Sequence, residues 1–253
     1  MIMLAADYDG TLKQGTITRL DLDAITKFRS LGNIFGVVTG RSLSMMKEEF
    51  DKFDLKFDFF IAQNGAIAFT DTFTTIYETQ INPIVSARLI NMLQKLGPAM
   101  YGAATRDKHT VFHMSRQFYD ERIAYYDIPL IVETWHNLNG ILSFFICDFS
   151  SDAISELYNK LSSEFSDLLS FHYNDGTIDV TAPGLNKSKG VQRVIEFFKP
   201  QCALTIGNEM NDLSMIVDFG GFSVANGRPE VQAAASRVFE NIDQCITFIL
   251  ETN

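Results

Sequence analysis

The chain has 253 residues, enough for one large domain or two unequal ones with a substantial apolar core. Its formal net charge is −10 and it contains no basic run, which argues against nucleic acid as a partner. No signal peptide or membrane-spanning segment is apparent, and the cysteines lack metal-ligand spacing, so we expect a cytoplasmic protein with reduced core cysteines and no membrane partner. The three cysteines are Cys147, Cys202 and Cys245.

The first predicted element is a strand that begins at Ile2 and runs into two carboxylates, Asp7 and Asp9. An uninterrupted apolar run of this length is typical of a central strand buried on both faces. Residues two apart project to the same side of an extended chain, so Asp7 and Asp9 can address one point beyond the strand. Gly10 permits a sharp turn after them. The alternative is a surface Asp-Gly turn without chemistry.

A helix and a second buried strand follow. Thr18 and Asp21 form a capping pattern, and apolar residues then recur at helical spacing as far as Gly32. Residues 34–38 predict the strand, which ends in Thr39-Gly40-Arg41. If the two strands are parallel neighbours, Thr39 lies beside Asp7, where a hydroxyl and a backbone N–H can hold phosphate oxygens. An ordinary turn is the alternative.

A third strand over 57–62 ends in Gln63-Asn64-Gly65, and residues 66–69 and 74–80 predict a hairpin. Asn64 suits a left-handed turn position, or it contacts a ligand. Asn82-Pro83 predicts the start of a helix and Gly97-Pro98 its end.

The pattern changes between residues 82 and 183, where we expect an inserted α+β domain. Strands are predicted over 100–104, 109–114, 131–135, 141–147, 168–173 and 177–181, with helices over 117–126 and 151–165. Without ligand spacing, the histidines are expected on the surface or in packing, and the aromatic side chains in the core. The histidines are His109, His113, His136 and His172; the aromatic residues are Trp135, Tyr119, Tyr125 and Tyr126.

The first domain, residues 1–81, resumes over 184–253. Lys187 and Lys189 precede a helix over 191–198, and a strand over 202–206 ends in the polar run from Gly207 to Asp212. A strand over 222–224 and helices over 229–235 and 242–250 complete the chain. Alternating strands and helices predict an α/β fold with a doubly wound, Rossmann-like parallel sheet.

Four motifs now stand in a fixed order: Asp-x-Asp-Gly-Thr, Thr-Gly-Arg, a Lys, and Gly-Asn-Glu-x-Asn-Asp. Their combination resembles the haloacid dehalogenase superfamily of aspartate-nucleophile phosphatases, and within it the Cof-type group with a large α+β cap. The resemblance covers nearly the whole chain and implies that Asp7 is the nucleophile and Asp9 the general acid and base. It also implies phosphate-binding residues (Thr39, Gly40, Lys187, Asn211), Mg²⁺ ligands (Asp7, Asp9, Asn208, Asp212) and substrate contacts (Arg41, Asn64).

Two departures from the family pattern matter. The usual last motif is Gly-Asp-x-x-Asn-Asp, whereas Asn208 is neutral, so metal affinity should be lower. Asp212 is expected as a ligand or as an anchor, and Glu209 is a candidate to compensate. Lys187 is favoured over Lys189 by its spacing to the helix alone.

The leading hypothesis is a Mg²⁺-dependent phosphatase acting on a small phosphorylated metabolite, such as a sugar phosphate. Alternatives are a phosphomutase, a non-catalytic ligand-binding descendant with a weakened metal site, and a signalling receiver, against which the second Asp and the insertion speak. The sequence indicates neither a particular substrate nor an oligomeric state.

Overall fold

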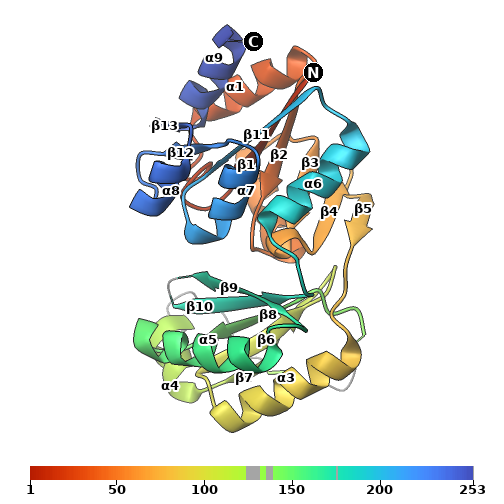
Figure 1. Cartoon of the computed structure of the whole chain (residues 1–253), viewed down its shortest axis with the longest axis vertical. Helices are drawn as coiled ribbons and strands as arrows, with labels where there is room; N and C mark the ends of the chain where they lie inside the picture. Colours follow the sequence, from red (N-terminus) through yellow and green to blue (C-terminus); the bar gives the residue numbers. More distant parts are fainter. Residues whose placement is uncertain (124–131, 135–138, 175, 253) are drawn as a thin grey trace. The chain divides into compact units, whose positions relative to one another are not determined.

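The computed structural model describes residues 1–123, 132–134, 139–174 and 176–252 (Figure 1). The chain divides into two compact units. The core unit comprises Met1–Arg41, Met45–Glu78 and Asn186–Asn253, and the inserted unit comprises Ser42–Ser44 and Thr79–Leu185. Within the described ranges, the helices are all too short or too polar to cross a bilayer.

The core unit contains an eight-stranded sheet in the order β13-β12-β11-β1-β2-β3-β4-β5. β1 (Ile2–Asp7) lies inside the sheet, parallel to β2 and β11 on either side. The other strands are β2 (Ile34–Val38), β3 (Phe59–Ala62), β4 (Ile67–Thr70), β5 (Thr75–Glu78), β11 (Cys202–Gly207), β12 (Phe222–Val224) and β13 (Arg237–Phe239). Only the β3–β4 and β4–β5 pairs are antiparallel among these strands. The predicted α/β fold with a parallel-sheet core is confirmed.

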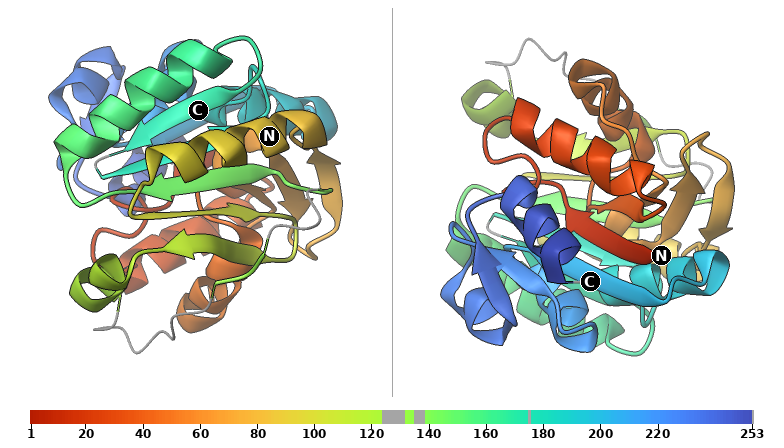
Figure 2. Two further views of the ribbon diagram at one scale, coloured as in Figure 1. Left: turned by 90° about the horizontal axis from the view of Figure 1, so that it is seen from below. Right: turned by 90° about the horizontal axis from the view of Figure 1, so that it is seen from above.

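Helices cover both faces of this sheet, as Figure 2 shows for α1 and α6. The helical segments are α1 (Arg19–Ser30), α2 (Leu43–Phe53), α6 (Lys187–Phe198), α7 (Leu213–Asp218), α8 (Pro229–Ala234) and α9 (Ile242–Thr252), with short turns η1 (Gln63–Gly65) and η4 (Met210–Asp212). Thr18 and Asp21 cap α1 reciprocally, as predicted. Apolar side chains of β1, β2 and β3 pack against Val191 and Val194 of α6, which fixes the start of that helix near the end of β1.

The inserted unit contains an antiparallel sheet in the order β7-β6-β8-β10-β9. Its strands are β6 (Met100–Ala104), β7 (His109–Met114), β8 (Ser143–Cys147), β9 (Ser170–Asn174) and β10 (Thr177–Thr181). Its helical segments are α3 (Pro83–Leu96), α4 (Arg116–Phe118), η2 (Tyr119–Ile123) and α5 (Ser151–Phe165). α3 and α5 lie side by side on one face, where Arg88 and Glu164 form an ion pair at 3.5 Å (Figure 1).

Several predictions for single elements differ from the structure. β13 was not predicted, because three residues of which two are exposed carry no apolar pattern. Residues 132–134 form no strand, and the rest of the strand expected over 131–135 lies outside the described residues, as do Trp135, His136, Tyr125 and Tyr126. Cys202 is exposed at the start of β11, so its predicted core position is wrong. His109 stacks on Phe145, with ring centroids 4.1 Å apart.

Candidate active site

The centre of the site is an ion-paired cluster at the carboxyl end of β1. Asp7 is the last residue of that strand and is buried, and its Oδ1 accepts a hydrogen bond from Lys187 Nζ at 2.6 Å. The same ammonium donates to Asp212 Oδ1. Burial and the Asp212 carboxylate raise the pKa of Asp7 to about 7, against the lowering effect of Lys187. Burial alone would lower the pKa of Lys187, but the carboxylates of Asp212 and Asp7 outweigh it and raise that pKa.

Lys187 reaches this position because the start of α6 is in close contact with η1. Gly65 has φ +96°, and an added Cβ there would lie 2.3 Å from the Asn186 carbonyl oxygen. Gly190, one turn into α6, lies against Gly65 itself. A side chain at either glycine would therefore push α6 away from η1. Lys187 is 2 % exposed, whereas Lys189 is exposed on the outer side of the helix. The structure therefore brings Lys187, and not Lys189, to the cluster.

The loop after β11 is held by Asp212. Its Oδ2 accepts from the backbone N–H groups of Asn208 at 2.9 Å and Glu209 at 3.0 Å, while its Oδ1 accepts from Lys187. Both carboxylate oxygens of Asp212 thus have partners within the protein. Of the two roles expected for this residue, metal ligand or anchor, this arrangement corresponds to the anchor. Glu209 pairs with Arg228 at 2.6 Å and does not take the place of an acid at position 208.

The Asn208 side chain faces a group of acceptors. One of its two terminal amide atoms lies 2.8 Å from Thr11 Oγ1, 3.0 Å from the Asp9 carbonyl oxygen and 3.2 Å from Asp7 Oδ2. With the amide nitrogen in this place, Asn208 donates to these acceptors. With the amide oxygen in this place, it faces the Asp9 carbonyl oxygen and Asp7 Oδ2, and only the Thr11 hydroxyl donates a hydrogen bond to it.

Asp9 lies beyond the end of β1 and has a different partner. Both of its carboxylate oxygens accept from the Arg41 guanidinium, from Nε at 2.7 Å and from Nη2 at 2.6 Å. The Arg41 backbone N–H donates to Thr39 Oγ1 at 3.1 Å. Arg41, expected as a substrate contact, is therefore bound to Asp9 in this structure.

The remaining predicted residues surround Asp7. Thr39 is buried and follows β2, next to β1, and within the described chain the Gly40 N–H makes no hydrogen bond. Asn64 has the left-handed conformation expected of it, with φ 52° and ψ 36°, and its N–H donates to the Thr39 carbonyl oxygen at 3.0 Å. Asn211 Nδ2 donates to Asn64 Oδ1 at 3.3 Å. The structure thus gathers the polar ends of β1, β2, β3 and β11 in one place.

Two polar contacts of the site were not predicted from the sequence. The Thr11 hydroxyl contacts the Asn208 side chain at 2.8 Å. Tyr8, between the two aspartates, is fully buried, and its hydroxyl donates to Glu49. Glu49 lies 41 positions away and belongs to none of the four motifs, and Tyr8 occupies the unspecified position of the first one.

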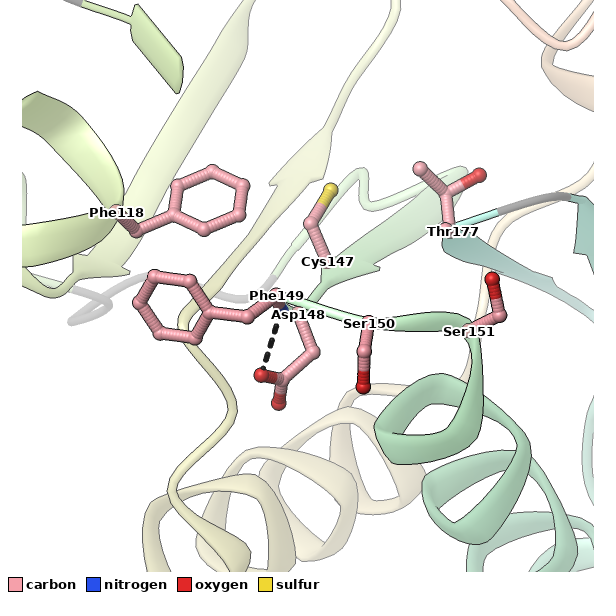
Figure 3. Close-up of a pocket in the computed structure, with 8 residues that line it drawn as sticks. Phe118, Cys147, Asp148, Phe149, Ser150, Ser151 and Thr177 are labelled. Atoms are coloured by element: carbon pink, nitrogen blue, oxygen red, sulfur yellow. Dashed lines mark hydrogen bonds between the residues drawn. The ribbon is translucent and has the colours of Figure 1, made fainter. Parts of the chain in front are cut away.

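A separate pocket of the inserted unit has a volume of about 520 Å³ (Figure 3). Phe118 and Phe149 form one wall, and Cys147, Asp148 and Ser150 line the rest. Asp148 accepts a hydrogen bond from the Phe149 N–H at 2.8 Å, within its own loop. Nothing about these side chains selects a particular ligand.

The fold and the buried cluster together define an α/β protein with an ion-paired aspartate-lysine site at the carboxyl end of its central strand. The family model of the haloacid dehalogenase-like hydrolases matches residues 4–245, and the chain belongs to this family. No curated protein matches the sequence.

Solved structures with the same fold cover nearly the whole chain. A protein from Plasmodium vivax, described as a HAD/COF-like hydrolase, shares 20% identity at a TM-score of 0.83, covering 99% of this chain and 96% of that one. A subclass IIB sugar phosphatase shares 18% identity at a TM-score of 0.79, with coverage of 98% and 99%. A phosphatase from Bacteroides thetaiotaomicron shares 17% at 0.80, with coverage of 99% and 94%. At these identities the likeness shows the fold alone.

Proposed function

We propose that this chain is a Mg²⁺-dependent phosphatase that hydrolyses a small phosphorylated metabolite, such as a sugar phosphate, through an aspartyl-phosphate at Asp7. The observation that carries the proposal is the buried Asp7 carboxylate at the end of a central strand, with one oxygen held by Lys187. A carboxylate fixed by one oxygen presents the other as a nucleophile. The family membership and the phosphatases among the structural neighbours support the same reaction.

The donor set suits a hard divalent cation. The Asn208 amide oxygen, when turned inward, is 3.2 Å from Asp7 Oδ2 and 3.0 Å from the Asp9 carbonyl oxygen. Neighbouring oxygens around Mg²⁺ are also about 3 Å apart, because each lies about 2.0–2.1 Å from the ion in an octahedron. The described residues contain no group of three or more His, Cys, Asp or Glu side chains suited to a metal, so this set relies on a carbonyl and an amide.

Asp7, Asp9 and Asn208 would therefore hold the ion, and Asp212 would act through Lys187 and the loop backbone. With Asp7 and Asp212 ionised against Lys187, the buried cluster carries one net negative charge, which a cation would compensate. Once bound, Mg²⁺ neutralises charge on the transferring phosphoryl group.

In the proposed reaction an Asp7 oxygen attacks phosphorus while the bond to the leaving oxygen breaks. Asp9, protonated at the outset, gives its proton to that oxygen, and the alcohol leaves. The Asp9 carboxylate then takes a proton from a water that attacks the phosphorus, which frees Asp7 and inorganic phosphate. Thr39, the Gly40 N–H, Lys187 and Asn211 are the groups proposed to hold the phosphate oxygens.

The test is phosphate release from p-nitrophenyl phosphate with Mg²⁺. Asp7→Asn should abolish it, whereas Asp23→Asn, at an exposed position of α1, should leave it unchanged. Retained activity in Asp7→Asn would place the nucleophile elsewhere. A panel of phosphorylated metabolites then identifies the substrate class, and an isomerised product instead of free phosphate would indicate a phosphomutase. We also propose a reducing, cytoplasmic location, since all three cysteines are free.

A further inference from the structure

Arg41 forms the most specific charge contact of the site outside the buried cluster. Its guanidinium binds Asp9 through two parallel hydrogen bonds, at 2.6 and 2.7 Å, so that both carboxylate oxygens are occupied. Paired N–H groups fix the orientation of a carboxylate as well as its position, which a lysine cannot reproduce. Two of the three guanidinium nitrogens are therefore used on Asp9.

Arg41 is itself held from several directions. Its backbone N–H donates to Thr39 Oγ1 at 3.1 Å, and its carbonyl accepts from the Gln63 N–H at 3.1 Å. Its guanidinium lies over the ring of Tyr8, 5.5 Å from the centroid. A cation over an aromatic face is attracted to it, and this face cannot move aside, because the Tyr8 ring is fully buried.

A further anchor holds the ring at its outer end. The Tyr8 hydroxyl donates to Glu49 on α2, and Lys13 donates to the same carboxylate. Lys13 also closes the turn that carries Asp9, since its carbonyl accepts from the Gly10 N–H at 3.0 Å and its N–H donates to the Tyr8 carbonyl at 2.8 Å. The contacts thus connect the turn after β1 to the turn after β2.

We infer that Arg41 is a positioning residue that acts through Asp9, rather than a substrate-binding residue; the inference rests on the proposed phosphatase function. While Asp9 carries the proton, one of its oxygens can accept from Arg41 and the other can present the proton to the leaving oxygen. Once the proton has moved, the carboxylate regains both bonds to the guanidinium. Negative charge then develops where a fixed cation already lies, which favours the transfer.

The effect of removing the Arg41 guanidinium on kcat/KM should depend on the leaving group of the substrate. A poor leaving group, such as phenoxide, needs a proton as it departs, whereas dinitrophenoxide departs without one. Arg41→Met should therefore lower kcat/KM for phenyl phosphate about 10- to 100-fold and leave kcat/KM for 2,4-dinitrophenyl phosphate within about threefold. Water attack on the phosphoenzyme also uses Asp9, so the variant should release a burst of dinitrophenolate before a slow steady state.

The matched control is Arg29→Met. Arg29 binds Asp58 through two similar hydrogen bonds, at 2.8 and 3.0 Å, in the same unit but outside the site, and the two arginine side chains are similarly exposed. This variant should lose thermal stability and show no dependence on the leaving group. Arg41→Lys should recover only part of the loss in Arg41→Met, because an ammonium cannot bind both oxygens in parallel.

A double variant decides whether Arg41 acts through Asp9. In an Asp9→Asn background, Arg41→Met should change kcat/KM for phenyl phosphate less than about twofold. An undiminished loss in that background, or an equal rise in KM for both esters with kcat unchanged, would overturn the inference and make Arg41 a substrate contact. Wild-type protein that hydrolyses neither ester with Mg²⁺ would overturn the phosphatase proposal itself, and this inference with it.

Discussion

Replacement of Lys187 by methionine should damage both stability and turnover. Methionine keeps most of the aliphatic stem and removes the ammonium that Asp7 and Asp212 share. Because Lys187 is 2 % exposed and both carboxylates are buried, water does not replace it as a partner. Removing one member of a buried ion pair costs about 3–5 kcal/mol, far more than the pair gains over an apolar substitute.

This cost is large enough to measure by thermal unfolding. One kcal/mol shifts the midpoint by about 2–4 °C in chains of 150–250 residues, so Lys187→Met should lower Tm by roughly 6–20 °C. Lys189→Ala is the control at the exposed lysine, where substitutions stay within about 0.5 kcal/mol, and it should shift Tm by less than about 2 °C. Both scans are run in EDTA, so that metal binding does not contribute.

A double variant separates stability from chemistry. Lys187→Met with Asp212→Asn removes one charge of each sign and restores the net charge of the cluster, and an amide oxygen can still accept from the N–H groups of Asn208 and Glu209. It should recover at least half of the lost Tm, yet remain at least about 100-fold below wild type in phosphate release. A Lys187→Met protein as stable as wild type, or a Lys189→Ala protein destabilised to the same degree, would refute the reasoning.

Three further predictions concern other residues. Asn208→Asp should tighten Mg²⁺ binding at least about tenfold in calorimetry, because it adds a negative charge to the donor set; unchanged affinity would place position 208 outside it. Cys202 is exposed and should react first with a disulfide reagent, well before Cys147, whose pKa burial raises to about 12; simultaneous labelling would contradict this. Partial desolvation of the imidazole, which stacks on Phe145, lowers the pKa of His109 from its usual 6.5, so its contribution to stability is complete above that pH and is lost as the pH falls below it. His109→Gln should therefore show a flatter Tm between about pH 7 and pH 5 than wild type, and parallel profiles would rule this out.

The sequence was sufficient for the core fold because its strands are short apolar runs with polar ends. β2 has the predicted bounds, 34–38, since every residue in it is buried and the chain leaves the sheet at Thr39. β13 shows the opposite case, in which three mostly exposed residues join the sheet edge by pairing alone. Such pairing depends on the neighbouring strand β12, and the local sequence of β13 carries no information about that neighbour.

Within the candidate site, the sequence predicted which residues gather and missed some of their partners. Strand order brings Asp7, Thr39 and Asp212 to one edge of the sheet. Alternating strands and helices predict parallel strands with right-handed crossovers, but they do not predict which strands are neighbours. The direction of each side chain does not follow from strand order. The pairing of Arg41 with Asp9, and of Tyr8 with Glu49, depends on turn geometry and on how α2 packs, so neither could be predicted from spacing.

The departure at Asn208 is confined to the end of one side chain. Its backbone keeps the contacts that shape the loop, since its N–H donates to Asp212 at 2.9 Å and its carbonyl accepts from the Arg228 N–H at 2.9 Å. An aspartate here would put a carboxylate oxygen against two acceptors, whereas an amide can turn its nitrogen toward them when no cation is present. The same amide offers an oxygen when a cation binds, with one charge less than an aspartate. If the proposed cation site is correct, we therefore expect Asn208 to stabilise the metal-free site at the expense of metal affinity, without a change in loop geometry between the two states.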